Sequence, residues 1–191
     1  MDELEFVSLA LPPAITLVAR RVGFDNKYVT LYDDEVMFAD GRQGTYVRVV
    51  ESQGMPGVAC VVTHASKIAL VLVYRYPTAS WEWGIPRGFA AGDNPIESLL
   101  MELDEELGGE PESVVRLGDV TPNSGLLAGE VAIFHATWPS TQANPRDTQE
   151  VRAVKWVSLR DLGAGIREGV VKDAITLAAL TLLREHGVLS E

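Results

Sequence analysis

The sequence contains a single cysteine, Cys60, and no second thiol with which it could form an intramolecular disulfide. Proteins without disulfides are typical of the reducing cytoplasm, where we expect this chain to be located. Cys60 lies in an apolar run, and a cysteine in such surroundings is usually a small buried hydrophobic side chain. We therefore assign it no chemical role.

Positive charge is also scarce. The chain carries 16 Lys and Arg against 27 Asp and Glu, which gives a net charge of −11. Nucleic acids and anionic membranes are bound by clustered cations, so this balance argues against a broad surface for either. We predict no nucleic acid and no membrane as a partner, although a small anionic substrate could still be held through a metal.

Targeting and membrane-spanning segments are missing as well. Residues 1–10 are acidic and lack the basic start of a signal peptide. No apolar run approaches the length of about 20 residues that spans a bilayer. With 191 residues, 47% of them hydrophobic, the chain is long enough for one well-buried domain with a small appended subdomain. We expect a soluble intracellular protein.

The most informative stretch is acidic and lacks Lys and Arg from Gly88 to Val115. Within it, apolar residues recur at steps of three and four between Pro95 and Leu107, which predicts an amphipathic helix. Asp93 and Asn94 can cap its start, and Gly108 with Gly109 suits its end. The acidic residues of the stretch are Asp93, Glu97, Glu102, Asp104, Glu105, Glu106, Glu110 and Glu112.

Three of these carboxylates, Glu102, Glu105 and Glu106, crowd one turn of one helix face. Like charges that close raise one another's pKa unless a cation lies among them, and Mg²⁺ prefers oxygen ligands of this kind. A solvated acidic face is the alternative. The preceding segment Trp83–Gly88 favours the metal, because this stiff Gly- and Pro-containing turn brings backbone and the cation of Arg87 to the mouth of the acidic face.

This segment resembles the signature of the Nudix hydrolases, in which a Gly, five residues, a Glu and seven residues precede Arg-Glu-apolar-x-Glu-Glu-x-Gly. The residues that fit the second half are Glu102, Leu103, Glu105, Glu106 and Gly108. The first half departs from the signature: Gly88 lies one residue too close, Asp93 replaces the first Glu, and Met101 stands in place of the Arg. In the family that Arg helps to hold the metal-binding glutamates.

The N-terminal part reads as a loosely ordered lead, residues 1–14, followed by a small antiparallel β unit, residues 15–54. Its predicted strands are Ile15–Arg21, Lys27–Asp33, Glu35–Phe38 and Thr45–Ser52, with a turn at Asp40-Gly41 between the last two. The unit resembles the N-terminal subdomain of the ADP-ribose pyrophosphatase branch, which helps to form a homodimer that shares its substrate sites. A sheet extension of a monomer is the alternative.

Residues 55–191 are predicted to form the Nudix hydrolase domain. Its predicted strands are Val58–Thr63 and Ile68–Tyr74, which form a buried hairpin, and Val114–Leu117, Val131–Thr137 and Val151–Val157. A second helix is predicted over Lys172–His186, and it resembles the terminal helix of the same branch. The resemblance implies an α/β fold, a Nudix α/β/α sandwich whose mixed central sheet lies between the two helices.

The resemblance also implies a ligand set. Glu102, Glu105 and Glu106 would hold Mg²⁺, with Mn²⁺ as a substitute and a backbone carbonyl of Ala90 or Ala91 as a further ligand. The residues predicted to contact the substrate are Arg75, Glu82, Arg87 and Gly88, because the stretch Arg75 to Gly88 resembles a segment that lies beside the nucleotide in related sequences.

The general base must be a carboxylate near the metals that is not itself a metal ligand, and Glu150 is the candidate. Glu106 is predicted to be catalytic as a metal ligand. Glu150 follows the polar loop Ser140–Thr148, a predicted mobile lid, and its placement resembles that of the loop glutamate used as base in ADP-ribose pyrophosphatases. Glu130 is the alternative candidate for the base. A third interpretation is that Glu150 is only a solvated carboxylate in a loop.

Two functions remain. The first is a Mg²⁺-dependent pyrophosphohydrolase that cleaves a nucleoside diphosphate linked to a sugar, such as ADP-ribose or an ADP-sugar, to nucleoside monophosphate and sugar phosphate. The second is a catalytically weak or inactive Nudix-like module that binds a nucleotide-sugar, which Met101, Asp93 and the shortened loop support.

Overall fold

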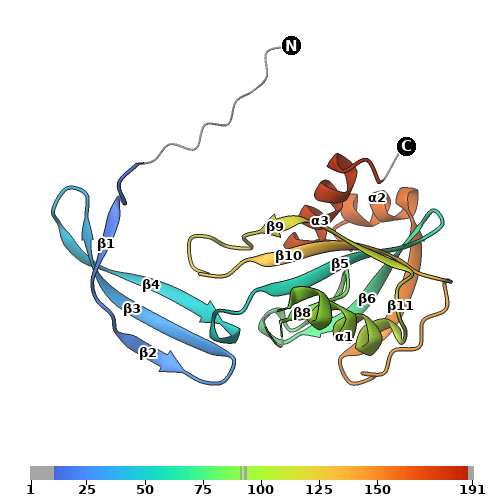
Figure 1. The fold of residues 1–191 in the computed structure, drawn as a ribbon, viewed down its shortest axis with the longest axis horizontal. Coiled ribbons are helices and arrows are strands. Elements are labelled where there is room, and N and C mark those ends of the chain that lie inside the picture. The colour runs from blue at the N-terminus through green and yellow to red at the C-terminus, as the bar shows by residue number, and fades with distance from the viewer. Residues whose placement is uncertain (1–10, 91, 93, 189–191) are drawn as a thin grey trace, which may run out of the picture.

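The computed structural model describes residues 11–90, 92 and 94–188, and it contains two β-sheets (Figure 1). The smaller sheet is antiparallel and projects from the rest of the molecule as an arm. Its strands are β1 (Ile15–Ala19), β2 (Val22–Asp25), β3 (Val29–Phe38) and β4 (Gln43–Glu51). The central β3 pairs with β4 along one edge and with β1 and then β2 along the other.

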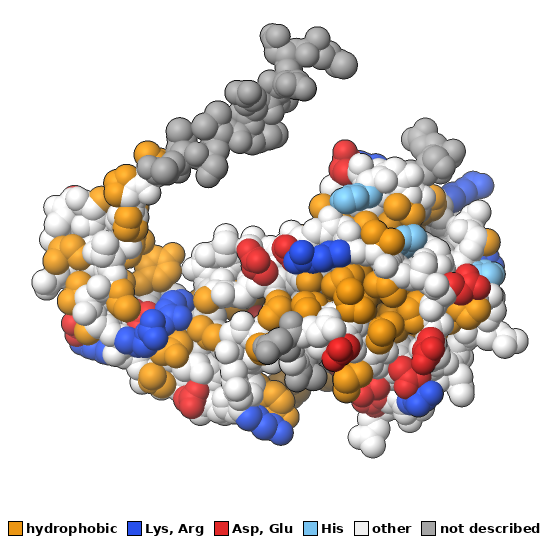
Figure 2. All heavy atoms as spheres, viewed as in Figure 1, with side chains coloured by type: hydrophobic (Ala, Val, Ile, Leu, Met, Phe, Trp, Pro, Cys, Tyr) orange, Lys and Arg blue, Asp and Glu red, His pale blue; other side chains and the backbone are white. Residues whose placement is uncertain are grey.

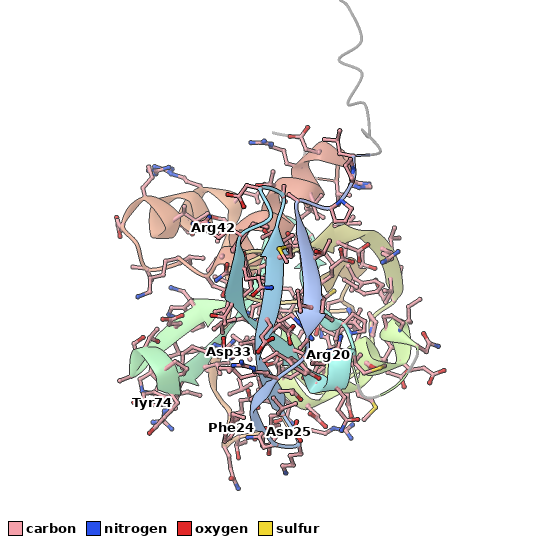
Figure 3. All side chains as sticks on the ribbon, turned by 90° about the vertical axis from the view of Figure 1, so that its left-hand side faces the viewer. Arg20, Phe24, Asp25, Asp33, Arg42 and Tyr74 are labelled. Carbon is pink, nitrogen blue, oxygen red and sulfur yellow. The ribbon has the colours of Figure 1, made fainter. Side chains whose placement is uncertain are left out.

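The arm exposes many large apolar side chains, as Figure 2 shows. Figure 3 views it end-on and places Phe24 and Arg42 at opposite ends. The predicted turn at Asp40-Gly41 is present, with Gly41 at φ 83° and its N–H bonded to the carbonyl of Phe38.

Two strand predictions in the arm were wrong. The segments predicted as Lys27–Asp33 and Glu35–Phe38 form one strand, β3, because Asp34 between them is buried and paired rather than located in a turn. Its carboxylate accepts hydrogen bonds from Arg48 Nε at 2.7 Å and from the backbone N–H of Arg21 at 3.3 Å. The first predicted strand ends at Ala19, and β2 was not predicted.

The larger sheet is mixed, as predicted, with the order β11-β6-β5-β10-β9. Its strands are β5 (Gly57–His64), β6 (Lys67–Arg75), β7 (Ser80–Gly84), β8 (Arg87–Phe89), β9 (Ser113–Val120), β10 (Val131–Thr137) and β11 (Val151–Ser158). β10 runs parallel to β5, and the other pairs are antiparallel. β5 and β6 form the predicted hairpin, and their apolar residues are almost all buried.

Helices cover both faces of this sheet, which confirms the α/β/α sandwich (Figure 1). The helices are α1 (Pro95–Leu107), α2 (Leu159–Arg167) and α3 (Ala174–Glu185), and short 3₁₀ turns occur at Ser52–Gly54 and Tyr76–Thr78. Leu99, Leu103 and Leu107 of α1 are fully buried on one face, and each contributes about 1.5–3 kcal/mol of burial free energy. α3 and the unpredicted α2 pack on the other face. α2 contains two glycines, which weaken its helical signal.

The segment predicted as a stiff turn, Trp83–Gly88, instead belongs to two short strands and their corner. β5 and β6 pair only beside their turn, and farther along β8 pairs with β5 and β7 pairs with β6. The corner between β7 and β8 is fixed by a bond from the N–H of Cys60 to the carbonyl of Pro86. The next element in the chain after β8 is α1.

Candidate active site

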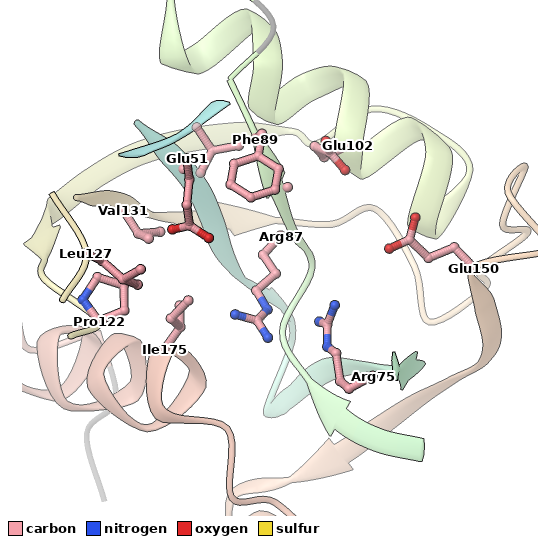
Figure 4. Close-up of a pocket in the computed structure, with 13 residues that line it drawn as sticks. Glu51, Arg75, Arg87, Phe89, Glu102, Pro122, Leu127, Val131, Glu150 and Ile175 are labelled. Carbon is pink, nitrogen blue, oxygen red and sulfur yellow. The ribbon is translucent and has the colours of Figure 1, made fainter. Parts of the chain in front are cut away.

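A cavity of about 440 Å³ opens beside the corner between β7 and β8 (Figure 4). The polar side chains at one end are Arg75, Glu102 and Glu150. The apolar side chains at the other end are Pro122, Leu127, Val131 and Ile175. One cavity therefore offers a charged end and an apolar end, with Arg87 lying between them.

Helix α1 places the acidic residues at the charged end. The Asn94 side chain caps the helix by accepting a hydrogen bond from the N–H of Ile96, and Pro95 follows at the first position. Gly108 ends the helix at φ 77°, in the left-handed region that glycine tolerates best. The predicted helix is confirmed, with Asn94 as its cap, whereas Asp93 lies outside the described residues.

The three glutamates differ in environment. Glu106 is only 5% exposed, and its Oε2 accepts a hydrogen bond from the backbone N–H of Arg87 at 3.1 Å. Burial, followed by the charge of Glu102, raises the pKa of Glu106 to about 8. Burial, followed by the charges of Glu105 and Glu150, raises the pKa of Glu102 to about 7. Glu105 itself is exposed. Burial is thus the main cause of both pKa shifts, and the neighbouring negative charges add to them.

The donor set fits a hard divalent cation, because it consists of carboxylate oxygens that repel one another. The Glu102 carboxylate lies against Gly88, where an added Cβ would overlap it. Within residues 11–90, 92 and 94–188, no three acidic, His or Cys side chains stand ready-made to coordinate an ion. Binding would therefore have to draw the flexible glutamates together. Ala90 is buried and its N–H bonds to the carbonyl of Pro56, while Ala91 lies outside the described residues.

Two cations lie in the cavity. Arg75 comes from the end of β6, and Arg87 comes from the start of β8. The Arg87 guanidinium pairs with Asp173, the residue before α3, at 2.9 Å. Burial lowers the pKa of Arg87; Asp173 opposes this shift and Arg75 adds to it. Both arginines thus line the same cavity as Glu102 and Glu150, and their contact with a substrate stays a prediction.

The structure does not bring Glu82 or Glu130 to the wall of this cavity. The Glu82 carboxylate accepts hydrogen bonds from Thr78 and Ser80, each at 3.0 Å, and lies 3.7 Å from Lys172 Nζ. Glu130 is exposed, and its backbone carbonyl accepts a bond from Gly57. Of the two candidate bases, Glu150 alone lines the cavity, at its charged end.

The loop that carries Glu150 is attached to α1. The N–H groups of Asn144 and Arg146 donate to the carbonyls of Leu107 and Glu105, each at 2.8 Å. The Arg146 guanidinium also pairs with Asp104 of the helix at 2.8 Å. The predicted lid is therefore fastened to the helix that carries the glutamates.

The residues that the sequence did not mark as part of the site include Glu51 and Phe89 in the cavity and Asp173, which anchors Arg87. Glu51, the last residue of β4, and Phe89 both project into the cavity (Figure 4). Nothing in their local sequence marks them, because they reach the cavity only through the packing of the arm and β8. Asp173 had a detectable signal, since an Asp directly before an apolar helical run is a typical cap.

A mixed sheet between two helical layers, with Glu102 of α1, Glu150 and two arginines lining one cavity, is an arrangement suited to metal-assisted hydrolysis of phosphoric anhydrides. The NUDIX domain model matches residues 54–180, and the chain belongs to this family. The chain is therefore classed with the Nudix hydrolases, which act on pyrophosphate bonds.

Among solved structures, the fold matches that of an ADP compounds hydrolase with a TM-score of 0.74. The match covers 93% of this chain and 96% of that chain at 20% sequence identity, which establishes likeness of fold. No curated protein matches the chain in sequence. None of the helices within the described part of the chain combines the length and apolar character that a bilayer crossing requires.

Proposed function

We propose that the protein is a divalent-cation-dependent pyrophosphohydrolase that cleaves a nucleoside diphosphate linked to a sugar into nucleoside monophosphate and sugar phosphate. The observation that carries the proposal is the cavity with an apolar end and a charged end joined by Arg87. A nucleoside fits the apolar end, and a diphosphate fits the charged end. The cavity volume lies within the range of about 300–1,000 Å³ that is usual for small-molecule sites.

The residues take distinct roles in this proposal. Arg75 and Arg87 donate to the diphosphate oxygens, because guanidinium groups bind such oxygens with two parallel hydrogen bonds. Glu102, Glu105 and Glu106 hold Mg²⁺, or Mn²⁺ in its place, with the carbonyl of Ala90 as a further donor. The cation supplies Lewis-acid polarisation of the phosphoryl groups when bound. Glu150 accepts the proton of the attacking water.

ADP-ribose and ADP-sugars are the first candidate substrates. The likeness to the terminal helix and N-terminal subdomain of ADP-ribose pyrophosphatases supports this choice, as does the shared fold with a hydrolase of ADP compounds. The Pro122 side chain at the apolar end supports a nucleotide-sugar further, since the segment Thr121–Gly125 resembles the Pro-Ser-Pro-Gly-type segment of the family, which carries a specificity-determining Pro.

One assay separates this proposal from a binding module that lacks turnover. The protein is incubated with Mg²⁺ or Mn²⁺ and a panel of nucleotide-sugars, and release of nucleoside monophosphate is measured. Turnover that disappears with a chelator supports the hydrolase. Saturable binding without turnover would support the module, for which the missing signature Arg at Met101 is the main argument.

We further propose that the arm joins two copies of the chain into a homodimer. The most exposed apolar side chains of the arm are Leu17, Val18, Val22, Phe24 and Tyr28, each more than half exposed. So many large exposed apolar side chains on one small sheet are unusual on a monomer and common at protein interfaces. The arm joins the body beside the cavity, through hydrogen bonds of Val49 with Leu126 and Ala128, so pairing of arms would lie near the substrate.

A further inference from the structure

Asp173 uses its two carboxylate oxygens for two different purposes. Oδ2 caps α3 by accepting hydrogen bonds from the N–H and the hydroxyl of Thr176, at 2.8 and 2.7 Å. Capping needs only an oxygen of this kind, and Asn or Ser supplies one about as well as Asp. Oδ1 instead pairs with Arg87 Nη2 at 2.9 Å. The negative charge of Asp173 is therefore more than the helix requires.

The ion pair lies in a sheltered position. The Asp173 side chain is 11% exposed and that of Arg87 is 22% exposed, so solvent screens their attraction only weakly. Arg87 also faces a second cation in the same cavity, Arg75, which repels it (Figure 4). Asp173 offsets this repulsion and fixes one edge of the guanidinium, while the other edge is left to the cavity.

The first turn of α3 also holds the backbone on which Arg87 stands. The Thr176 hydroxyl accepts a hydrogen bond from the N–H of Ile85 at 3.1 Å, across 91 residues of sequence. A Cβ on Gly84 would lie only 3.1 Å from the same hydroxyl, so the approach depends on glycine. Helix α3 thus locates the corner between β7 and β8 as well as the Arg87 side chain.

From these contacts we infer that Asp173 is a positioning residue that holds Arg87 in its diphosphate-binding orientation before the substrate arrives. The inference rests on the proposed function, since it assigns Arg87 to the diphosphate. An arginine that is already ordered loses less side-chain entropy when it binds. The contact of Asp173 with Arg87 should therefore mainly increase the affinity for the nucleotide. Nucleotide affinity would then depend on a carboxylate that does not touch the nucleotide.

The test compares Asp173→Asn with Thr176→Val, using ADP-ribose as the probe. Asn keeps the cap and removes the charge, so KM should rise about tenfold while kcat changes less than about threefold. Thr176→Val keeps both partners of the ion pair but removes the hydroxyl that bonds to Asp173 and to the Ile85 N–H, so it should lower the melting temperature and raise KM less than Asp173→Asn does. If Asp173→Asn fails to fold, Asp173→Ser replaces it, because Ser caps the helix and is too short to reach Arg87.

A double-mutant cycle shows whether Asp173 acts through Arg87. In an Arg87→Met background, Asp173→Asn should cause no further rise in KM. An equal rise in both backgrounds would overturn the inference, as would a fall in melting temperature without a change in KM.

A further readout does not depend on activity. The side-chain Nε–H signal of Arg87 in a ¹H–¹⁵N spectrum of the substrate-free protein, assigned by its loss in Arg87→Met, should be sharp in the wild type and in Thr176→Val. It should broaden in Asp173→Asn, and a signal that stays sharp there would contradict the inference. Absence of turnover by the wild type would count against the proposed function alone, because this spectrum still reports whether Asp173 holds Arg87.

Discussion

At the scale of single residues, the ionisation of Glu106 affects the stability of the free protein. Its folded pKa of about 8 lies above the ordinary value of 4.5, so the folded state binds the proton more tightly than the unfolded state. The resulting stability is fully present below about pH 4.5 and is lost as pH rises through about 8. Glu102, with a pKa of about 7, acts in the same direction.

Glu106→Gln should therefore flatten the decline of stability with pH and nearly abolish Mg²⁺-dependent hydrolysis. Gln retains the acceptor for the Arg87 N–H but carries no charge to desolvate, and it is a poor ligand for the cation. Melting temperatures in chelator from pH 5 to 8 check the first part, and turnover checks the second.

Glu105→Gln serves as the comparison: it should also lose hydrolysis, but its exposed side chain should change the pH dependence less. Identical pH slopes for wild type and Glu106→Gln would contradict the argument.

The base is predicted to be Glu150. Glu150→Gln should lower kcat by roughly 10²- to 10⁴-fold, the usual contribution of a positioned base, with little change in substrate or Mg²⁺ affinity. Glu130→Gln is the matched variant, and its exposed side chain lies away from the cavity wall. A normal kcat for Glu150→Gln beside a collapse for Glu130→Gln would transfer the role to Glu130.

We predict that position 88 must be a glycine because the Glu102 carboxylate occupies the space that a side chain would need. In Gly88→Ala the new methyl group would overlap the Glu102 carboxylate, which can swing away because its side chain is flexible. The Mg²⁺ concentration for half-maximal activity should rise roughly tenfold or more, the scale of effect seen when residues that orient metal ligands are changed, while the fold remains. Gly129→Ala is the control, since no atom lies within 4 Å of its added Cβ. An unchanged Mg²⁺ requirement in Gly88→Ala would show that Glu102 does not hold the cation.

At the scale of elements, the end of α1 and the loop that carries Glu150 depend on each other. Gly108 adopts φ 77°, and an added Cβ would also overlap the backbone of Asn144, which cannot yield as a side chain can. Glu150 follows this loop directly, and Asp147 orients it by accepting hydrogen bonds from the N–H groups of Gln149 and Glu150. A change at the end of α1 should therefore also change the position of Glu150, the proposed base.

Gly108→Ala should lower the free energy of unfolding by more than the roughly 1–2 kcal/mol that a left-handed backbone costs, and it should also lower kcat by displacing the loop. Gly187→Ala isolates the backbone cost, because Gly187 follows α3 at φ 70° with no atom near its added Cβ. Denaturant unfolding of both variants gives the comparison. Equal destabilisation would mean that the contact with Asn144 contributes nothing.

At the scale of the whole molecule, the arm is the part whose surface does not suit a monomer. Phe24→Asp places a charge on its exposed apolar surface, and we expect the variant to be monomeric where the wild type is a dimer. Val170→Asp is the control, because Val170 is equally exposed but lies off the arm, between α2 and α3. Light scattering coupled to gel filtration measures both masses. A wild type that is monomeric at micromolar concentration would refute the homodimer.

Local sequence alone was sufficient for α1 and its glutamates. Apolar spacing, the cap at Asn94 and the stop at Gly108 act within a few residues of one another, so the helix and the face that carries Glu102 and Glu106 follow from short-range rules. The buried hairpin of β5 and β6 was readable for the same reason, since its apolar runs and its turn are adjacent in the chain.

Tertiary structure decided what depends on partners distant in sequence. Asp34 reads locally as a strand breaker, and hydrogen bonds from Arg48 on the neighbouring strand and from the N–H of Arg21 make its burial acceptable. The segment Trp83–Gly88, predicted as a turn, belongs largely to β7 and β8. β5 and β6 pair with each other only beside their turn, so the backbone groups farther along them bond to β8 and β7 instead. Glu51 reaches the cavity only where the arm meets the body, and Arg87 is held by Asp173 only because α3 packs against that corner. A sequence pattern records periodicity along the chain, whereas these contacts are set by which surfaces the chain brings together.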